Sequence, residues 1–297
     1  MSLGQTGSSV SSCILGDILQ SDTSICNGTT LDLFVRASNA SGSSCFLPQV
    51  KSEGNLNLSY ASTTSDAQGN VFLSGAFSGT LSTGGFTLNS QGGTDFFLIK
   101  YDSCGSVLWA ISGGSAGNED FSAGQYGKGI ACDAAGNVFL AGRYNQPCTI
   151  TGTTGSSFVA PYTVSAGYPN HQDGFLIKLD ATGKILWGIT VRGPGNDGIN
   201  AVAVDGSGNP VVSADFNDCC PTANAGTVYS TGSTVNVPSI NSNFGTGAII
   251  KFNAAGNALW VARIYNREVG VGSLAVDAGG SIYATGYFRS WNRGVAA

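Results

Sequence analysis

The chain of 297 residues has few charged side chains. They make up 10% of the sequence, against about 25% in an average soluble protein. The 13 lysines and arginines are scattered along the chain, and 18 acidic residues give a net charge of −5. Nucleic-acid binding depends on a concentrated positive surface that neutralises phosphates, so nucleic acid is not an expected partner.

The sequence also lacks the patterns that mark membrane insertion, secretion and metal binding. It has no apolar run of about 18 residues, so we expect no membrane insertion. The first residues lack a basic region followed by an apolar stretch, so we identify no intact signal peptide, although one could have been removed. No C-x-x-C pair occurs and His171 is the only histidine. A zinc site or haem attachment is therefore not expected, and we predict no cofactor.

Strong helix formers are outnumbered by glycine, serine and threonine. Glycine alone accounts for 44 residues, about twice its usual share of ~7%. This composition excludes a helical bundle, and the lack of a G-X-Y period excludes collagen. Hydrophobic residues reach 42%, which excludes a disordered polyelectrolyte. A turn-rich all-β protein remains.

Two motifs alternate along the chain. The first reads Asp-x-x-Gly-Asn followed by alternating apolar residues, and it begins at four aspartates: Asp66, Asp133, Asp205 and Asp277. The second consists of two apolar runs joined by a short polar turn, and it contains three equivalent tryptophans: Trp109, Trp187 and Trp260. With the apolar piece between them, the motifs predict about four strands per ~70 residues. Four-stranded units without intervening helices are typical of β-propeller blades.

The N-terminus carries a partial copy of the second motif. The sequence DLFVRASNASGSSCF from Asp32 aligns without a gap with DFFLIKYDSCGSVLW from Asp95. The chain thus starts with the second half of a repeat, and after Tyr287 and Phe288 it ends with the first half of one. We predict four blades, with the N-terminal strands completing the C-terminal blade and removing an exposed sheet edge.

An open or partial propeller is the alternative, because residues 1–31 and 289–297 do not continue the pattern. We expect a single domain over residues 1–297. Residues 1–53 would supply the closing strands, residues 54–288 the blades, and residues 289–297 a tail.

The first motif, D-x-x-G-N-V-[FY]-[LV]-[ST]-G-x-F, and the second, D-x-F-[LV]-x-K-[LY]-D-x-x-G-x-[LV]-L-W-A, resemble the SBBP β-propeller repeat family. The resemblance covers about residues 60–288, and residues 32–46 more weakly. It implies a propeller of the kind found in bacterial surface and secreted proteins, without a common catalytic site. The sequence departs from the family in two insertions, 145–171 and 217–245, and in Gly247, which we place at the strand-opening aspartate.

The repeated polar residues have structural interpretations. The Asp-x-x-Gly-Asn turns could offer calcium ligands, but they lack the further acidic positions that calcium needs, and an aspartate that caps its own turn explains them. Three recurring lysines, Lys100, Lys178 and Lys251, are expected to reach the rim or to pair with Asp102, Asp180 or the strand-opening aspartate. We interpret the three tryptophans as packing between blades.

Catalytic patterns are weak, and we predict that the protein is not an enzyme. Residues 113–117 match G-x-S-x-G, but no helix follows, as a nucleophile elbow requires. His171 lies in an insertion without an evident partner, so we expect a solvated side chain. Glu119 and Asp120 are adjacent in a glycine-rich loop, which does not indicate the separated carboxylates of a glycosidase.

The two insertions are the expected contact sites, because loops on a rigid scaffold commonly carry recognition. The candidate contact residues are Tyr162, Tyr168, His171 and Tyr229. In that case deletion of either insertion should leave the fold intact and abolish partner binding. The plainer interpretation is that the insertions are decoration or extra outer strands.

Eight cysteines leave buried thiols and disulfides as alternatives. Cys45 and Cys132 lie in apolar runs and favour buried thiols. Polar, loop-like surroundings favour disulfides at five others: Cys13, Cys26, Cys148, Cys219 and Cys220.

The leading hypothesis is a non-enzymatic scaffold at a cell surface, in a secreted assembly or on a virion, with protein or glycan partners and the capacity to form an oligomer or larger assembly. The alternatives are a polysaccharide-binding module, with calcium as an aid, and a propeller hydrolase or lyase. Innermost strands with small apolar residues would favour the scaffold, whereas convergent polar residues would favour a site.

Overall fold

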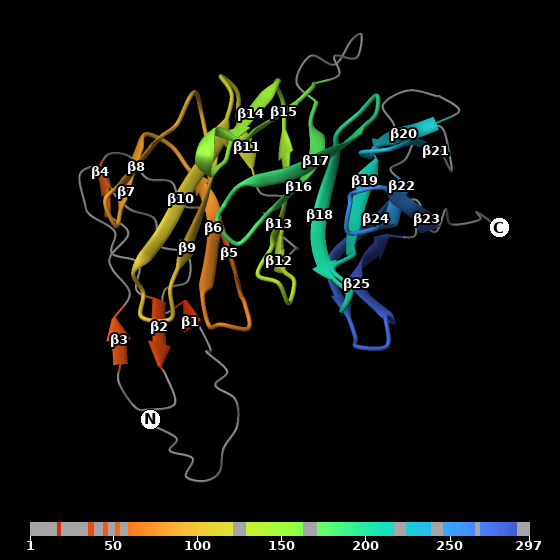
Figure 1. Ribbon diagram of the computed structural model, residues 1–297. Helices are drawn as coiled ribbons and strands as arrows, with labels where there is room; N and C mark the ends of the chain where they lie inside the picture. Colours follow the sequence, from red (N-terminus) through yellow and green to blue (C-terminus); the bar gives the residue numbers. More distant parts are fainter. Residues whose placement is uncertain are drawn as a thin grey trace, which may run out of the picture.

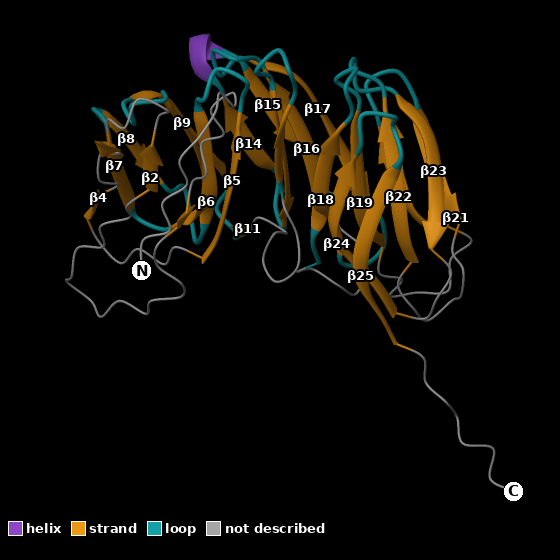
Figure 2. Cartoon of the chain, turned by 90° about the horizontal axis from the view of Figure 1, so that it is seen from below, coloured by secondary structure: helices purple, strands orange, loops and turns teal. Residues whose placement is uncertain are grey.

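The chain folds as an all-β protein, as predicted. The computed structural model describes residues 17–18, 35–38, 44–46, 51–53, 59–120, 129–162, 171–216, 224–238, 246–264 and 268–289. Within these ranges the helical structure is limited to the 3₁₀ turn η2 (Thr153–Gly155). Antiparallel sheets stand side by side along the molecule (Figure 2).

The first complete sheet, blade A, has the four strands that the two motifs predict. They pair antiparallel in the order β5–β6–β9–β10. Their bounds are β5 (Ser59–Ser65), β6 (Val71–Phe77), β9 (Asp95–Tyr101) and β10 (Val107–Gly114). Every residue of β6 and β9 is buried, because the two central strands are covered on both faces. The buried residues are mostly apolar, but they include Ser74, Asp95 and Lys100.

Blades B and C repeat this order. In blade B, two short inner strands, β11 (Glu119–Asp120) and β12 (Ile130–Cys132), pair with β13 (Val138–Tyr144), and β16 (Asp173–Leu179) and β17 (Ile185–Arg192) follow. Blade C consists of β18 (Asp197–Val204), β19 (Pro210–Phe216), β22 (Thr246–Phe252) and β23 (Ala258–Ile264). The inner strands of neighbouring blades touch in sequence, β5 with β12, β12 with β18, and β18 with β24.

The strand register corrects one sequence assignment. Asp95 pairs with Phe77 in blade A, and Asp173 pairs with Tyr144 in blade B. The equivalent pair in blade C is Thr246 with Phe216. Thr246, rather than Gly247, therefore replaces the strand-opening aspartate.

The two insertions form hairpins that leave one blade and extend the preceding one. β14 (Cys148–Thr151) and β15 (Ser157–Ala160) follow β13 of blade B, yet β14 pairs with β10 of blade A. In the same way β20 (Asn224–Tyr229) and β21 (Thr234–Pro238) follow β19 of blade C, and β20 pairs with β17 of blade B. The interpretation as extra outer strands is confirmed.

The two ends of the molecule carry incomplete sheets. At one end lie the N-terminal sheet β1 (Asp17–Ile18), β2 (Val35–Ser38) and β3 (Ser44–Phe46), and a sheet of β4 (Lys51–Glu53), β7 (Thr80–Thr83) and β8 (Phe86–Asn89). At the other end, β24 (Glu268–Val276) and β25 (Ile282–Arg289) form blade D (Figure 1). Among the described strands β2 and β3 do not pair with β25, so the predicted ring closure and the count of four blades are not confirmed.

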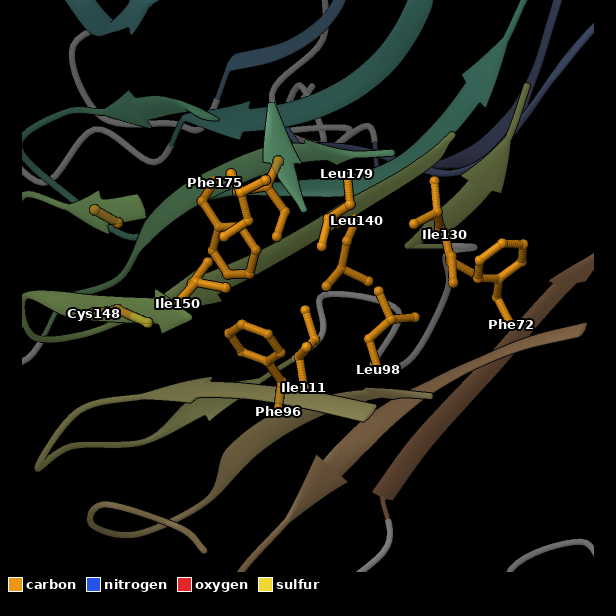
Figure 3. Packing of buried hydrophobic residues seen from close by; sticks show 14 of the residues in the cluster. Phe72, Phe96, Leu98, Ile111, Ile130, Leu140, Cys148, Ile150, Phe175 and Leu179 are labelled. Carbon is orange, nitrogen blue, oxygen red and sulfur yellow. The ribbon is translucent and has the colours of Figure 1, made fainter. Parts of the chain in front are cut away.

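One large apolar cluster lies between blades A and B, and a second of similar size lies between blades B and C. Phe96 of β9 and Phe175 of β16 face each other across the first cluster, with ring centroids 5.5 Å apart. Cys148 and Ile150 of the inserted strand β14 lie fully buried beside Ile111 of β10 (Figure 3). The insertion therefore contributes to the core itself.

In the described part of the chain, no helix has the length and apolar character needed to cross a membrane.

Candidate functional site

Each first motif folds as a turn that its own aspartate closes. In blade A, Oδ1 of Asp66 accepts hydrogen bonds from the backbone N–H groups of Gln68 (3.0 Å) and Asn70 (2.9 Å), and Oδ2 accepts one from the Asn70 amide (2.7 Å). Gly69 adopts a φ of +80°, which favours glycine. The same pattern recurs at Asp133 and Asp205. The structural interpretation of these turns is confirmed.

The recurring lysines pair with these turn aspartates, not with the partners that the sequence suggested. The Nζ atoms of Lys100, Lys178 and Lys251 lie 3.5, 3.7 and 2.9 Å from Asp66, Asp133 and Asp205 respectively. The prediction of pairing with Asp102, Asp180 or the strand-opening aspartate was wrong. Adjacent pairing of the second and third strands brings the turn aspartate and the lysine together, although the two residues belong to different motifs.

The lysine and the tryptophan of one blade also hold the next blade. Lys100 Nζ and Trp109 Nε1 each donate a hydrogen bond of 3.1 Å to the carbonyl of Ala181 in blade B. Lys178 and Trp187 donate to the carbonyl of Ala254 in blade C, at 3.4 and 3.1 Å. We call this set of residues the inter-blade clasp. It consists of a turn aspartate, the lysine paired with it, and a tryptophan, and the lysine and tryptophan donate hydrogen bonds to one carbonyl of the following blade.

The third clasp is incomplete. Lys251 and Asp205 form their ion pair, but Trp260 is 40% exposed, whereas Trp109 is 6% exposed. No carbonyl of a following blade accepts from Trp260 within the described residues. Packing of the tryptophans between blades is thus confirmed for Trp109 and Trp187, and Trp260 lies on an open face.

The ion pair of this third clasp shifts the acidity of its carboxyl group. Partial burial alone would raise the pKa of Asp205, but hydrogen bonds from Asn209 and the contact with Lys251 outweigh it and lower the pKa to about 2. Asp205 therefore stays ionised near neutral pH, as an acceptor for its turn and its lysine.

A glycine completes each clasp by letting the indole lie on the turn. Gly183 has a φ of +84°, and a Cβ there would lie 3.0 Å from the ring of Trp109. We predict that Gly183→Ala lowers the free energy of unfolding by about 2–4 kcal/mol, through left-handed strain and overpacking together.

Gly280 is the matched control, because it has the same φ with nothing within 4 Å of its missing Cβ. Gly280→Ala should cost only the strain, about 1–2 kcal/mol. Urea unfolding of the two variants measures the difference, and equal losses would show that contact with the indole is unimportant.

Each inserted hairpin extends the sheet of one blade and is also hydrogen-bonded to the following blade. Thr153 of η2 donates its backbone N–H to the carbonyl of Gly183 (2.9 Å), and the N–H of Ile185 donates to Ser156 Oγ (2.9 Å). The second hairpin repeats this, with Thr231 Oγ1 donating to the carbonyl of Ala255 (2.8 Å). Each hairpin covers one blade and ties it to the next, so its deletion would expose core residues; that the fold survives such a deletion stays a prediction.

The hairpins also end in exposed edges. β15 and β21 are the outermost strands of their sheets. On β15, Phe158 packs over Gly188 of blade B, whereas Val159 faces away and is 57% exposed. Val159 was not identified from the sequence. The alternation Thr-Val-Asn-Val at 234–237 was a signal for the equivalent edge on β21.

Tyr162 and His171 come together at the base of the first hairpin. The Tyr162 hydroxyl donates to the carbonyl of His171 (2.7 Å), and the two rings stack with centroids 5.1 Å apart. His171 is only 4% exposed. The expectation of a solvated histidine was wrong, and a side chain this buried cannot serve as a contact residue. Burial, with Asp173 nearby, raises the pKa of Tyr162.

Tyr229 lies elsewhere, at the end of β20, with a partly exposed ring. The guanidinium of Arg192 sits 3.6 Å from the centre of that ring, in a cation–π contact that holds it in place. Among the described contact candidates, Tyr229 keeps an accessible face. Tyr168 lies outside the described residues, and its role stays a prediction.

Cys132 and Cys148 lie on strands that belong to the blade sheets, whereas Cys45 lies on β3 of the N-terminal sheet. Cys148 lies on β14 in the core rather than in a loop, and its predicted disulfide stays a prediction. Burial, reinforced by Asp66 and Asp133, raises the pKa of Cys132 to about 12, so this thiol is unreactive near neutral pH. The remaining disulfide candidates lie outside the described residues: Cys13, Cys26, Cys219 and Cys220.

A polar cluster joins blades B and C. Arg143 of β13 donates to Asn200 Oδ1 (2.6 Å) and lies 3.5 Å from Asp215 of β19, to which Asn200 also donates. Burial raises the pKa of Asp215, and the bonds to Asn200 and Arg143 partly offset that rise. These three side chains bind one another and so act as a bridge between blades.

The innermost strands carry little chemistry. β12, β18 and β24 present mainly alanine, valine, isoleucine and leucine, and β5 presents serine and threonine. The charged residues of the inner strands are Asp197 and Glu268, which begin β18 and β24, and Glu119 and Asp120 of β11. Among the described residues no group of three His, Cys, Asp or Glu side chains could hold a metal ion.

Ser115 of the G-x-S-x-G match is buried and accepts a hydrogen bond from the N–H of Gly117 (2.9 Å), in a turn after β10 rather than a strand-to-helix elbow.

The blades, clasps and crossing hairpins define a repeat protein of antiparallel four-stranded units. No family model matches the sequence, so the resemblance to the SBBP repeat family stays a prediction. The chain is 28% identical over 207 residues to an uncharacterized WD repeat-containing protein of Acanthamoeba polyphaga mimivirus. The match covers 66% of this chain and 14% of that protein, and it supports a propeller-like arrangement of the blades.

Proposed function

We propose that the protein is a non-enzymatic, repeat-based scaffold that contacts other proteins through the outer edges of its inserted hairpins. The observation that carries the proposal is the exposed edge at the end of each hairpin, formed by β15 on blade A and by β21 on blade B. An edge strand offers backbone N–H and C=O groups to a partner strand. The two edges occupy equivalent places on successive blades, so one extended partner can meet both.

The position of the hairpins makes these edges rigid. Cys148, Ile150 and Ala160 anchor the first hairpin in the core, and η2 is bonded to the turn between β16 and β17. A partner would thus bind to an ordered surface and would not need to order a loop, which lowers the entropic cost of association.

The innermost strands support the non-enzymatic part of the proposal. In propellers a ligand site is built where polar groups converge on the centre, and here the inner strands are mostly aliphatic and small. The WD repeat relative supports a scaffold built by repetition, since stacked repeats present broad surfaces rather than a single pocket.

We extend the proposal to an exterior location, at a cell surface, in a secreted assembly or on a virion. The low charge and the abundance of serine, threonine and glycine suit a surface exposed to varied surroundings. Detection with an antibody in cells, culture medium and virions tests this part, and recovery only from the cell interior would contradict it.

The contact surface is tested with the substitution Val159→Glu on β15. Leu108→Ser is the matched control, because Leu108 is similarly exposed but lies on β10, away from the hairpin edge. Proteins from the native source that bind the intact chain would be identified, purified and titrated against all three forms. We expect Val159→Glu to weaken a reconstituted interaction at least about tenfold, and Leu108→Ser to leave it unchanged.

Equal weakening by both substitutions would contradict the assignment of the contact surface. If no purified protein bound and the chain instead bound a glycan array in a calcium-dependent way, the polysaccharide alternative would replace the scaffold. Unchanged thermal unfolding of both variants is required before either comparison is interpreted.

A further inference from the structure

Blade D has two described strands, β24 and β25. In blades A, B and C the second strand pairs with a third, as β6 does with β9, β13 with β16 and β19 with β22. In blade D the second strand is β25, and among the described strands it pairs only with β24. Within the described residues, no strand covers the other edge of β25, and Tyr283 and Tyr287 on this strand are exposed.

The open edge lies beside the incomplete clasp. Trp109 and Trp187 each donate to a carbonyl in the turn between the third and fourth strands of the following blade, at Ala181 and Ala254. Trp260 and Lys251 would reach the same turn of blade D, if that blade had its third and fourth strands. The face made by β25, Lys251 and Trp260 is thus shaped to receive a hairpin of third and fourth strands.

The N-terminal end holds such a hairpin without the two inner strands that normally accompany it. β2 and β3 pair with each other, and their sequence aligns without a gap with β9 and β10. The inner edge of β2 is covered for only two residues, where Val35 pairs with Ile18 and Arg36 with Asp17. The equivalent residues of β9, Leu98 and Ile99, pair with Ser74 and Leu73 of the second strand β6.

The hairpin and the open face lie at opposite ends of the same chain. β4 follows β3 and pairs with β7 at the outer side of blade A, so the hairpin is tied to that end. Figures 1 and 2 both show β25 well separated from β2, with β5 and β6 of blade A between them. A second copy would bring its hairpin onto this face without either chain changing blades A to D, and only β1 would have to leave the edge of β2.

We propose that the face formed by β25, Lys251 and Trp260 binds the β2–β3 hairpin of a second copy of this chain. The motif alignment sets the register: Val35 of the incoming hairpin lies opposite Thr285, and Arg36 opposite Ala284, where β1 lies in the unbound chain. The contact is head-to-tail, so it leaves an open face on one copy and a free hairpin on the other. The proposal is independent of the hairpin edges β15 and β21.

The test uses two full-length variants with opposite defects. Trp260→Ser removes the indole from the receiving face, and Arg36→Pro removes a backbone donor from the edge of β2. Light scattering after size exclusion, from low micromolar to submillimolar concentration, should show the unmodified chain growing in mass. We expect each variant alone to associate at least about tenfold more weakly, and an equimolar mixture to form heterodimers.

Leu259→Ser is the matched control, since Leu259 is exposed beside Trp260 and alternates to the other face of β23. It should associate like the unmodified chain. Far-ultraviolet circular dichroism and thermal unfolding check that Arg36→Pro leaves the blades folded, and if it does not, Val35→Asp replaces it.

Three outcomes would overturn the proposal. The first is a monomer at every concentration in which acrylamide quenches the fluorescence of Trp260. The fluorescence of Trp260 is the difference between the signals of the unmodified chain and of Trp260→Ser. The second is a monomer with Trp260 protected, which would mean that the chain's own hairpin fills the face. The third is association that Trp260→Ser and Leu259→Ser weaken equally.

Discussion

Replacing Trp109 by alanine should lower the free energy of unfolding by about 3–5 kcal/mol, the usual cost of removing a buried tryptophan. The indole is almost fully buried between blades A and B, it packs against Phe72 with centroids 5.9 Å apart, and its N–H holds the carbonyl of Ala181. Alanine leaves a cavity at the joint between two blades and removes one of the two donors to that carbonyl.

The equivalent replacement, Trp260→Ala, is the control that the repeat itself provides. Trp260 occupies the same place in its motif but lies on an open face, so at low protein concentration its loss should cost less than about 1 kcal/mol. Urea unfolding followed by circular dichroism measures both values. A similar loss at the two positions would mean that the clasp carries little of the stability between blades.

Replacing Asp66 by alanine should also cost about 3–5 kcal/mol, because it leaves the ammonium of Lys100 buried without its counter-ion. Lys100 is 4% exposed and would keep the Ala181 carbonyl and the face of the Phe72 ring, 4.9 Å from its nitrogen. These neutral contacts do not balance a charge removed from water.

Asp66→Asn and Asp277→Ala separate the charge from the turn. Asparagine keeps an oxygen for the turn N–H groups but removes the charge, so most of the loss should remain. Asp277 closes an equivalent turn by accepting from the N–H of Ser281 (2.8 Å), but it is exposed and has no lysine partner among the described residues. Its replacement should lower the free energy of unfolding far less than that of Asp66, because it removes only solvent-exposed hydrogen bonds. Urea midpoints at neutral pH give all three values, and a loss at Asp277 equal to that at Asp66 would refute a role for the buried charge.

Local patterns in the sequence were sufficient to predict the all-β fold, the blades and the aspartate turns. Two alternating motifs fix two strand pairs and two turns in each repeat, and their hydrogen bonds span only a few residues, as at Asp66 and Asn70. Packing of the tryptophans between blades could also be predicted, since an apolar residue repeated once per unit has to face a neighbouring unit.

The sequence did not reveal which edge an insertion would join. The strand residues 148–151 are polar in part, and nothing local in them distinguishes pairing with their own blade from pairing with β10 of the preceding one. The same limit applies to Lys100, for which the nearest aspartate in the sequence is Asp102, although adjacent strands bring it to Asp66. Long-range pairing of this kind is set by the packing of whole blades.

For the candidate site too, the sequence indicated the local features but not those that depend on long-range packing. The insertions were predicted as the contact region, and this stays a prediction. Within them His171 proved to be buried with Tyr162 half-buried beside it, and Val159 on the exposed edge was missed. Exposure within a hairpin depends on which face meets the blade below, and in β15 that is decided by the fit of Phe158 over Gly188.

The crossing hairpins set the order in which the chain can mature on the ribosome. Blade A is fully synthesised once Gly114 emerges, but its outer strands β14 and β15 end at Ala160. At about 5–20 residues per second, β10 waits roughly 2–9 s with its edge exposed. Each further blade is sealed in the same delayed way by the repeat that follows it. The nascent protein therefore always carries one unprotected sheet edge at its growing end. A chaperone would be most useful at this edge, because an unpaired edge strand promotes aggregation.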